Sequence, residues 1–200
     1  CGDPGIQFDD TMNKWHTCPN SGRINSSNPC SEYNFIDNSS CNLASLNLRA
    51  FVDMDGSFNV KDFENAIRFT AIAQDLEIDN SSFPTMKIAE NSHKFRPLGM
   101  GYANLGSLIM SLGLAYDSDE ARIIAAAITS LMTAKVYETS TEMAEKIGSF
   151  EEFEKNKEPM LRVIKKHMDA FGKIERNKIP DGYKEVYDAS ERIWGNVLRR

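Results

Sequence analysis

The chain has 200 residues, of which 41% are hydrophobic and 26% are charged, which is enough for one domain, or part of a larger domain, with a real core. The formal net charge is −6 and charges of both signs are interspersed, so the chain lacks the basic stripe that nucleic-acid binding needs. The apolar runs are far too short for a membrane span and no cleavable signal is visible, which predicts a cytoplasmic protein without membrane contacts.

The four cysteines, Cys1, Cys18, Cys30 and Cys41, occur without a secretory signal, which favours a reducing compartment. Thiols in that setting tend to be catalytic, redox-active or metal-bound, and a structural disulfide is not expected. Zinc sites usually contain a closely spaced pair such as Cys-x-x-Cys, and His16 with Cys18 makes only half a site, so no metal site is expected. The chain begins at Cys1 rather than at a methionine, and we expect it to be a piece of a longer protein.

Residues 1–50 are rich in Asn, Ser, Gly and Pro, which predicts short strands and ordered loops rather than helices. The expected strands are the apolar runs Ile6-Gln7-Phe8 and Tyr33-Asn34-Phe35-Ile36. Such a long irregular stretch is typical of a compact domain only when its loops are functional.

The run Ser27-Asn28-Pro29-Cys30-Ser31-Glu32 is the candidate functional loop. Side chains two residues apart point the same way in an extended or tightly looped segment, so Asn28, Cys30 and Glu32 can converge on one small polar substrate. A thiol, a hydrogen-bonding amide and a general base form a credible reaction centre. The spacing alone leaves a second interpretation open, in which Cys30 is a small buried residue beside an Asn-Pro turn.

From about Val60 the pattern becomes helical, and the first helix has one apolar face through Phe63 and Ile67. Its second apolar face consists of Phe69, Ile72, Ala73 and Leu76. We therefore expect this helix to be covered on two sides. The further expected elements are a helix from the N-cap Ser82 to Asn91, a strand over Arg96–Tyr102, a helix over Ala103–Leu112, a long helix from the N-cap Ser118 to about Lys146, a helix over Glu158–Phe171 with Pro159 in its first position, and a helix over Lys184–Leu198.

Two conspicuous features of the second half are not expected to be functional. Gly99 and Gly101 lack the third glycine of a dinucleotide-binding loop and the Gly-Lys-Ser/Thr of a phosphate loop, so close backbone packing is the expected reason for them. Lys165, Lys166 and His167 are expected to form a solvated face, and His167 is given no catalytic role.

Four longer motifs follow one another along the chain. They are Gly2-Asp3-Pro4-Gly5-Ile6-Gln7-Phe8, Trp15-His16-Thr17-Cys18-Pro19-Asn20, Gly22-Arg23-Ile24-Asn25-Ser26-Ser27-Asn28-Pro29-Cys30-Ser31-Glu32, and Arg96-Pro97-Leu98-Gly99-Met100-Gly101-Tyr102-Ala103-Asn104-Leu105-Gly106. Together they resemble the catalytic subunit of ribonucleotide reductases, and more narrowly the adenosylcobalamin-dependent class II enzymes. The resemblance is dense through about residue 50, returns at 96–147 and thins in the charged C-terminal third.

The resemblance implies a role for each residue of the candidate loop. Cys30 matches the cysteine that becomes a thiyl radical and takes hydrogen from C3′ of the ribose. Glu32 would accept the 3′-hydroxyl proton as a general base, and Asn28 would hold the ribose hydroxyls by hydrogen bonds. Cys41 matches one member of the dithiol that reduces the substrate and ends as a disulfide, with its partner upstream of this chain. Cys18 is expected to be structural.

The implied fold is α/β, a part of the ten-stranded α/β barrel of ribonucleotide reductases, with residues 1–200 as a partial catalytic barrel domain. Strands and the radical-bearing finger loop would occupy 1–50, and 60–200 would be mainly helical. The implied activity is reduction of ribonucleotides to 2′-deoxyribonucleotides for DNA synthesis by a ribonucleoside-diphosphate reductase, with adenosylcobalamin bound by the complete enzyme. The implied partners are a ribonucleoside di- or triphosphate substrate, thioredoxin or glutaredoxin as reductant, and a second copy in a homodimer. Cofactor-binding residues are not identified, and the chain is expected to be inactive alone.

Two alternatives remain open. The first is a class I reductase, which shares the loop chemistry but obtains its metal-dependent radical from a partner subunit. The second belongs to a different class of protein, a mainly helical binding or scaffold module in which Cys30 is a packed structural residue. Cobalamin dependence distinguishes the first, and nucleotide binding with thiol reactivity distinguishes the second.

Overall fold

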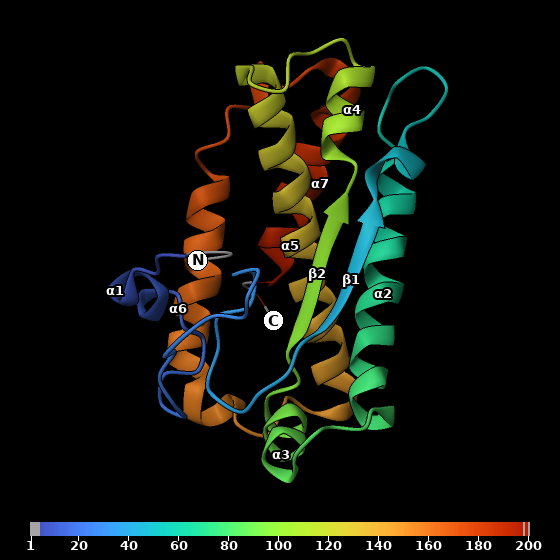
Figure 1. Ribbon diagram of the computed structural model, residues 1–200. Helices are drawn as coiled ribbons and strands as arrows, with labels where there is room; N and C mark the ends of the chain where they lie inside the picture. Colours follow the sequence, from blue (N-terminus) through green and yellow to red (C-terminus); the bar gives the residue numbers. More distant parts are fainter. Residues whose placement is uncertain (1–4, 198, 200) are drawn as a thin grey trace.

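The computed structural model describes residues 5–197 and residue 199 (Figure 1). Its elements, in chain order, are α1 (Asp9–Lys14), β1 (Asn42–Asn47), the 3₁₀ helix η1 (Leu48–Phe51), α2 (Val60–Asn80), α3 (Met86–Phe95), β2 (Leu98–Ala103), α4 (Leu105–Ser111), α5 (Asp119–Ile147), α6 (Phe153–Phe171), the 3₁₀ helices η2 (Arg176–Lys178) and η3 (Asp181–Tyr183), and α7 (Lys184–Val197). Cys1, the start of the Gly2–Phe8 motif and Leu198 lie outside the described residues. None of the described helices is long and apolar enough to cross a membrane.

The core lies where α2, α5 and α7 pack together. The central helix is α5, and its buried stripe consists of Ile124, Ala127, Ile128, Leu131 and Ala134. Between α5 and α7, the hydroxyls of Ser130 and Ser190 hydrogen bond at 2.7 Å, and Nε1 of Trp194 donates to Ser130 Oγ at 3.0 Å. Ser190 and Trp194 are buried but paired, so they join the two helices without the desolvation cost of an unpaired polar group.

The boundaries of α5 are the ones that the sequence predicts. Ser118 Oγ accepts a hydrogen bond from the N–H of Ala121 at 3.1 Å, which caps the first turn. Gly148, with φ +90°, ends the helix in a conformation that favours glycine. The predicted start of the first long helix at about Val60 is also confirmed. The strand predicted over Arg96–Tyr102 is found as β2, which begins two residues later and ends one residue later.

The two strands form a parallel pair in which Asn42 lies opposite Leu98. The connection between them runs through α2 and α3, the helical crossover that parallel strands need. Leu46 and Met100 pack toward the helical core, and α5 and α7 lie behind the sheet in Figure 1. Leu43, on the opposite face, is 62% exposed. One face of the sheet is therefore covered by helices, and the described residues leave the other face open.

The helix before α7 begins at Phe153 rather than at Glu158, so Pro159 lies inside α6 and not in its first position. Because a proline has no N–H to donate, the carbonyl of Lys155, four residues earlier, loses its helical partner. Asn20 takes that place and donates from Nδ2 to the Lys155 oxygen at 2.7 Å. The helix continues past the proline because the N-terminal segment satisfies this open carbonyl.

The same contact anchors the N-terminal segment on α6. The N–H of Asn20 donates to Oδ1 of Asn156 at 3.0 Å, and Nδ2 of Asn156 donates to Ser21 Oγ at 2.7 Å. Ser21 Oγ in turn donates to Glu152 Oε2 at 2.7 Å. Since Asn156 is fully buried, these hydrogen bonds are shielded from water and give the irregular segment a fixed position.

Several predictions for the first hundred residues are wrong. The described residues contain no strand at 6–8 or 33–36, and the pairing in this region is an isolated bridge between Ser27 and Asn34. The helix predicted from Ser82 is α3, and Thr85 caps it because its Oγ1 accepts from the N–H of Ile88 at 3.3 Å. The strand β1 follows the candidate loop at Asn42–Asn47, where no particular strand is predicted.

The ten-stranded barrel is not seen in the part of the chain that the structure describes. The described residues hold one sheet of two parallel strands, within a mostly helical structure. The family-level expectation of an α/β arrangement is met by the β1–α2–α3–β2 unit, since its strands are parallel and its crossover is helical.

Two expectations about helix faces also need correction. The second apolar face of α2 is left uncovered by the described residues, with Phe69 66% exposed and Leu76 57% exposed. The basic run on α6 is partly covered, because Lys166 Nζ lies 4.9 Å from the Trp15 ring centroid and the His167 ring centroid lies 5.2 Å from it. Such a lysine–tryptophan contact is a favourable cation–π interaction.

The burial of α5 generates a stability prediction. In the complete protein, Ile128→Ala should lower the free energy of opening of α5 by about 2–5 kcal/mol, because it leaves a cavity in a fully buried site. Ile147→Ala on the same helix, where the side chain is 75% exposed, should change it by less than about 0.5 kcal/mol. Hydrogen exchange of α5 measures both, and equal losses would contradict the described packing.

Candidate functional site

The candidate loop is a tight turn closed by Asn28. Oδ1 of Asn28 accepts from the N–H of Tyr33 at 3.0 Å, and the N–H of Asn28 donates to the Tyr33 carbonyl at 3.3 Å. Within the turn, the N–H of Ser31 donates to the Asn28 carbonyl at 3.0 Å, and Pro29 holds the second position, where its fixed φ is favourable. Ser31 has φ +68°. These contacts place Cys30 at an exposed tip.

Tyr33 connects this turn to Cys41. Its hydroxyl lies 3.0 Å from Ser39 Oγ and 3.2 Å from the carbonyl oxygen of Ser40, the residue directly before Cys41. Burial raises the pKa of Tyr33, so the phenol stays protonated and can donate. The Tyr33 side chain thus connects the turn to the residue before Cys41.

The segment that leads into Cys41 is fixed on α3. Ser40 Oγ and Ser92 Oγ lie 2.6 Å apart, and Ser92 is buried. Nδ2 of Asn91 donates to the carbonyls of Asp37 and Asn38 at 3.3 and 3.0 Å. The position of Cys41 therefore follows from a short loop held at both ends, by Tyr33 and by α3.

The thiol of Cys41 lies against Gly99 of β2. A Cβ atom at Gly99 would stand 2.8 Å from Cys41 Sγ and would also collide with the side chain of Leu43. The predicted close packing is thus confirmed at Gly99. It is wrong at Gly101, where the nearest atom to an added Cβ, apart from its chain neighbours, is Ser45 Oγ at 3.7 Å, an ordinary contact.

Burial, and after it the negative charge of Glu32, raises the pKa of Cys41 to about 11. Both effects disfavour the thiolate, so Cys41 is a neutral thiol near pH 7. The effect of Glu32 also shows that this carboxylate lies within electrostatic reach of the Cys41 sulfur. The charge of Glu32 on the turn therefore acts on the Cys41 thiol.

The structure places the four predicted site residues as follows. Cys30 and Glu32 are exposed on the turn, and Glu32 acts electrostatically on the half-buried Cys41. Asn28 closes the turn with its side-chain oxygen Oδ1, so among the described residues its role is to shape the loop. Its Nδ2 group is left for other contacts. Glu32 influences Cys41 through its charge, and Cys30 shares the turn of Glu32.

Sequence reasoning missed Tyr33 and Gln7. Nε2 of Gln7 donates to Ser31 Oγ at 3.0 Å, which ties the first described residues to the turn next to Cys30. Gln7 lies inside the Gly2–Phe8 motif, and its place in that motif is the sequence feature that could have indicated a role. No sequence feature indicated Tyr33, because the contacts of its hydroxyl with Ser39 and Ser40 depend on how the loop folds back.

The other cysteine and histidine of this region support the loop. Cys18 is buried beside Ile36 and Phe95, and burial raises its pKa. His16 is 2% exposed, accepts from the N–H of Cys18 at Nδ1 and lies 2.9 Å from the Gly22 carbonyl through Nε2. Within residues 5–197 and 199, no group of three or more His, Cys, Asp or Glu side chains is placed to hold a metal ion.

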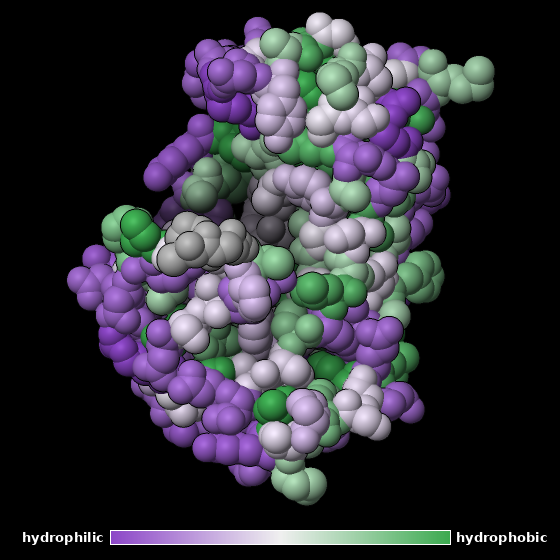
Figure 2. All heavy atoms as spheres, in the orientation of Figure 1, coloured by the Kyte–Doolittle hydropathy of each residue, from purple (hydrophilic) through white to green (hydrophobic). Residues whose placement is uncertain are grey.

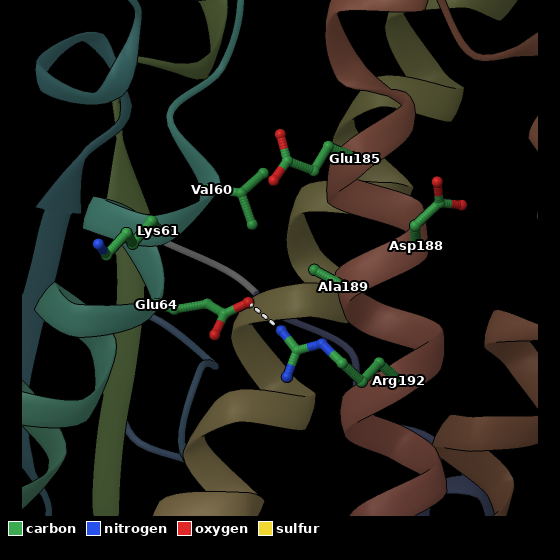
Figure 3. Close-up of a pocket in the computed structure, with 7 residues that line it drawn as sticks. All are labelled: Val60, Lys61, Glu64, Glu185, Asp188, Ala189 and Arg192. Atoms are coloured by element: carbon green, nitrogen blue, oxygen red, sulfur yellow. Dashed lines mark hydrogen bonds and ion pairs between the residues drawn. The ribbon is translucent and has the colours of Figure 1, made fainter.

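Two surface cavities are found among the described residues. One opens between the start of α2 and α7, where Arg192 donates to Glu64 at 2.6 Å (Figure 3). The other lies beside the loop around Gly22 and the helix α3. Neither is lined by Cys30 or Cys41. Figure 2 shows mainly hydrophilic side chains over α6 and the N-terminal segment, with apolar patches that are scattered.

A family model described as "Ribonucleotide reductase, barrel domain" matches residues 1–199. The vitamin B12-dependent ribonucleotide reductase of Rhodopirellula baltica is 52% identical over 198 residues, which are 99% of this chain and 19% of that protein. The enzyme of the same name from Streptomyces avermitilis is 50% identical over 202 residues, 99% of this chain and 21% of that protein. The vitamin B12-dependent ribonucleoside-diphosphate reductase of Mycobacterium tuberculosis is 34% identical over 152 residues, 76% of this chain and 22% of that protein. The chain spans about a fifth of the length of these relatives.

The contact of Tyr33 with Ser39 and Ser40 predicts the effect of removing one hydroxyl. In the complete protein, Tyr33→Phe should weaken the loop over residues 28–41 by about 0.5–1.5 kcal/mol, the net value of a hydrogen bond. Hydrogen exchange in that segment should rise while α5 stays protected. Tyr116→Phe, at a side chain that is 66% exposed, is the matched control, and an equal effect of both variants would refute the bracing role.

The electrostatic link between Glu32 and Cys41 predicts a change in thiol reactivity. Glu32→Gln removes a negative charge, which lowers the pKa of Cys41 and increases its thiolate fraction at pH 8. Alkylation of Cys41 by iodoacetamide, followed by mass spectrometry, should therefore accelerate by roughly two- to tenfold, since one pKa unit is a factor of ten. Glu120→Gln, in the first turn of α5, should leave the rate unchanged. A rate unaffected by Glu32→Gln would contradict the electrostatic influence of Glu32 on Cys41.

Proposed function

Because this chain belongs to the ribonucleotide reductase barrel-domain family, we propose that it carries the thiyl-radical cysteine and one of the two reducing thiols of a ribonucleotide reductase. One observation supports this most directly. A single hydrogen-bonded turn presents Cys30 and Glu32 together, and Tyr33 joins that turn to Cys41, whose pKa responds to Glu32. These are the groups that the reaction needs, gathered from one short segment.

In the proposed reaction, the Cys30 thiyl takes hydrogen from C3′ of the ribose, which makes the neighbouring 2′-hydroxyl easier to expel as water. Glu32 accepts the 3′-hydroxyl proton, a general-base role that its exposed position on the turn permits. Cys41 and a partner thiol outside this chain together supply two hydrogens and become a disulfide, and Cys30 returns its hydrogen to C3′. The sum is ribonucleotide plus dithiol giving deoxyribonucleotide, disulfide and water.

The protonation state of Cys41 suits this role. A thiol that delivers hydrogen must carry its proton, and the pKa of about 11 keeps Cys41 neutral at physiological pH. Glu32 contributes to this, because its charge disfavours a second negative charge nearby. In this proposal Glu32 serves as base toward the substrate, and its charge adds to the larger effect of burial in favouring the protonated thiol.

Adenosylcobalamin is the proposed radical source of the complete enzyme, as the names of the relatives indicate. Bound there, the cofactor would supply the radical that converts the Cys30 thiol to a thiyl. Cys30 fits this role because it is exposed and its sulfur has no hydrogen-bond partner among the described residues. The two described cavities are not lined by Cys30, so we assign no described residue to holding the cofactor.

The same proposal includes a ribonucleoside di- or triphosphate as substrate, thioredoxin or glutaredoxin as reductant, a homodimeric complete enzyme and a cytoplasmic location.

The class I and scaffold alternatives are supported to different degrees. A class I reductase would use the same turn, but the relatives reported above are named as vitamin B12-dependent. A scaffold module would require a packed Cys30, and the described turn leaves Cys30 exposed.

The test uses the complete protein with and without adenosylcobalamin. Ribonucleotide reduction should require the cofactor and should disappear in Cys30→Ala and in Cys41→Ala, because each variant removes an essential thiol. Cys18→Ala is the matched control and should keep activity, since Cys18 is buried in a separate cluster. Reduction of substrate by Cys30→Ala at the wild-type rate would overturn the proposal, and activity without cobalamin would favour the class I alternative.

A further inference from the structure

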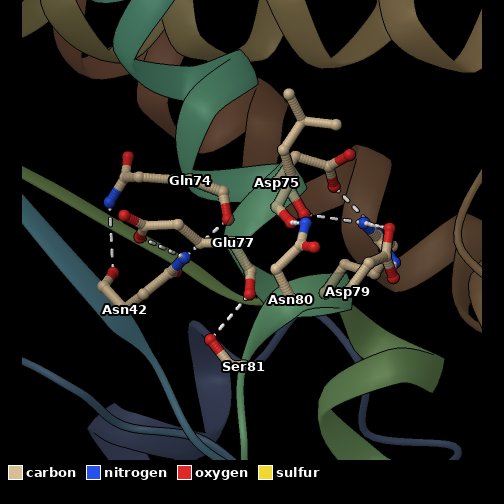
Figure 4. A network of polar contacts seen from close by, with 9 residues as sticks. Asn42, Gln74, Asp75, Glu77, Asp79, Asn80 and Ser81 are labelled. Carbon is tan, nitrogen blue, oxygen red and sulfur yellow. Dashed lines mark hydrogen bonds and ion pairs between the residues drawn. The ribbon is translucent and has the colours of Figure 1, made fainter.

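Gln74 joins α2 to both strands beside Cys41. It lies in α2 and is only 2% exposed. Its Nε2 group donates to the carbonyl oxygen of Asn42 at 3.1 Å and to that of Gly99 at 2.9 Å. Asn42 is in β1 and Gly99 in β2, so one amide group hydrogen bonds to the main chain of both strands. Figure 4 shows the bond to Asn42.

The contact is reciprocal on the β1 side. Nδ2 of Asn42 donates to the main-chain carbonyl of Gln74 at 2.5 Å and to Glu77 Oε2 at 3.3 Å. Figure 4 shows the two amide side chains reaching across from α2 and β1 toward each other. The first residue of β1 is thereby fixed to α2 by hydrogen bonds in both directions.

The entry to β2 is fixed to the same part of α2. Arg96, with φ +46°, donates from Nε to Asp75 Oδ1 at 2.7 Å and from Nη1 to Asp79 Oδ1 at 2.8 Å. This ion-pair cluster holds the residue two before the strand. It does not reach β1, so Gln74 is the described side chain that hydrogen bonds to the main chain of both strands here.

The two carbonyls that Gln74 binds belong to the residues that define the place of the Cys41 thiol. Asn42 follows Cys41 directly in the chain, and Gly99 provides the space where the sulfur lies. A shift of β1 along β2 would move the thiol away from Gly99, toward positions with different burial. The hydrogen bonds of Gln74 oppose such a shift.

We propose that Gln74 is a positioning residue for the Cys41 thiol, which it holds against Gly99 by fixing the start of β1 to β2. The proposal rests on the function proposed above for Cys41. Gln74 itself lies on the helix-covered side of the sheet and has no part in contacting substrate.

The free-energy cost of the unpaired polar atoms at this site supports a specific need for the amide group of Gln74. Oε1 of Gln74 and Oδ1 of Asn42 are buried and have no hydrogen-bond partner among the described residues. A buried polar atom without a partner is unfavourable, and an apolar side chain of similar size would avoid that cost. The double donation from Nε2 is what an apolar side chain cannot supply.

The test compares Gln74→Leu with wild type in the complete enzyme. We expect kcat to fall by about ten- to a hundredfold, because a small misplacement of a reacting group has effects of that size. KM should change by less than about threefold, since the ground-state contacts to substrate are untouched. Alkylation of Cys41 at pH 8 should accelerate by at least about threefold, because a displaced thiol is less buried and its pKa falls. Alkylation of Cys30 should not change.

Ser190→Ala is the control for a purely structural loss. It removes a buried hydrogen bond between α5 and α7, and it should leave kcat and the alkylation of Cys41 unchanged. Gln74→Met, which keeps the length of the side chain, provides a second variant judged by the same measurements. Loss of fold in both Gln74 variants would overturn the proposal, because the residue would then be needed for the structure itself.

The outcomes also separate this proposal from the proposed function. If Cys30→Ala abolishes activity while both Gln74 variants keep wild-type kcat and wild-type alkylation of Cys41, the positioning role is wrong and the function stands. If Cys30→Ala remains active, the proposed function is wrong. A selective fall in kcat together with faster alkylation of Cys41 supports both.

Discussion

The packing of α5 against α7 and α2 is the constraint on which the rest of the structure depends. Two parallel strands cannot be stable alone, because they need a helical crossover and at least one covered face. The buried stripe of α5 and the apolar face of α2 provide that cover. With one face buried, the other face of β1 and β2 can remain open. Cys41 lies directly before Asn42, the first residue of β1. The helical core therefore determines where the segment that carries Cys41 joins the sheet.

Short polar contacts then convert an irregular segment into a defined site. Residues 15–41 contribute few large apolar side chains to the main core, so their position depends on hydrogen bonds to helix ends and to buried amides. Tyr33 and Gln74 act from opposite sides of Cys41, one from the loop before it and one from the helix behind the strand. Each contact is worth little alone, but groups shielded from water and joined in networks give the site a single arrangement.

The sequence predicted the features that depend on neighbouring residues. The cap at Ser118, the end at Gly148, the start of α2 and the strand through Gly99 all follow from local chemistry. The spacing of Asn28, Cys30 and Glu32 also indicated one loop. The sequence could not predict Tyr33 or Gln74, because their partners are set by how distant elements meet. Pro159 was misplaced for the same reason, since its tolerance inside a helix depends on Asn20.

That last contact has a consequence for how α6 and the N-terminal segment depend on each other. In a regular helix the Lys155 carbonyl would accept from the N–H four residues later, and Asn20 would then need another acceptor. Pro159 instead leaves this acceptor open, and the loop occupies it. The helix and the loop thus share one oxygen without competing for it. The position of the N-terminal segment, which carries Cys30, therefore depends on a break in the hydrogen-bond pattern of α6.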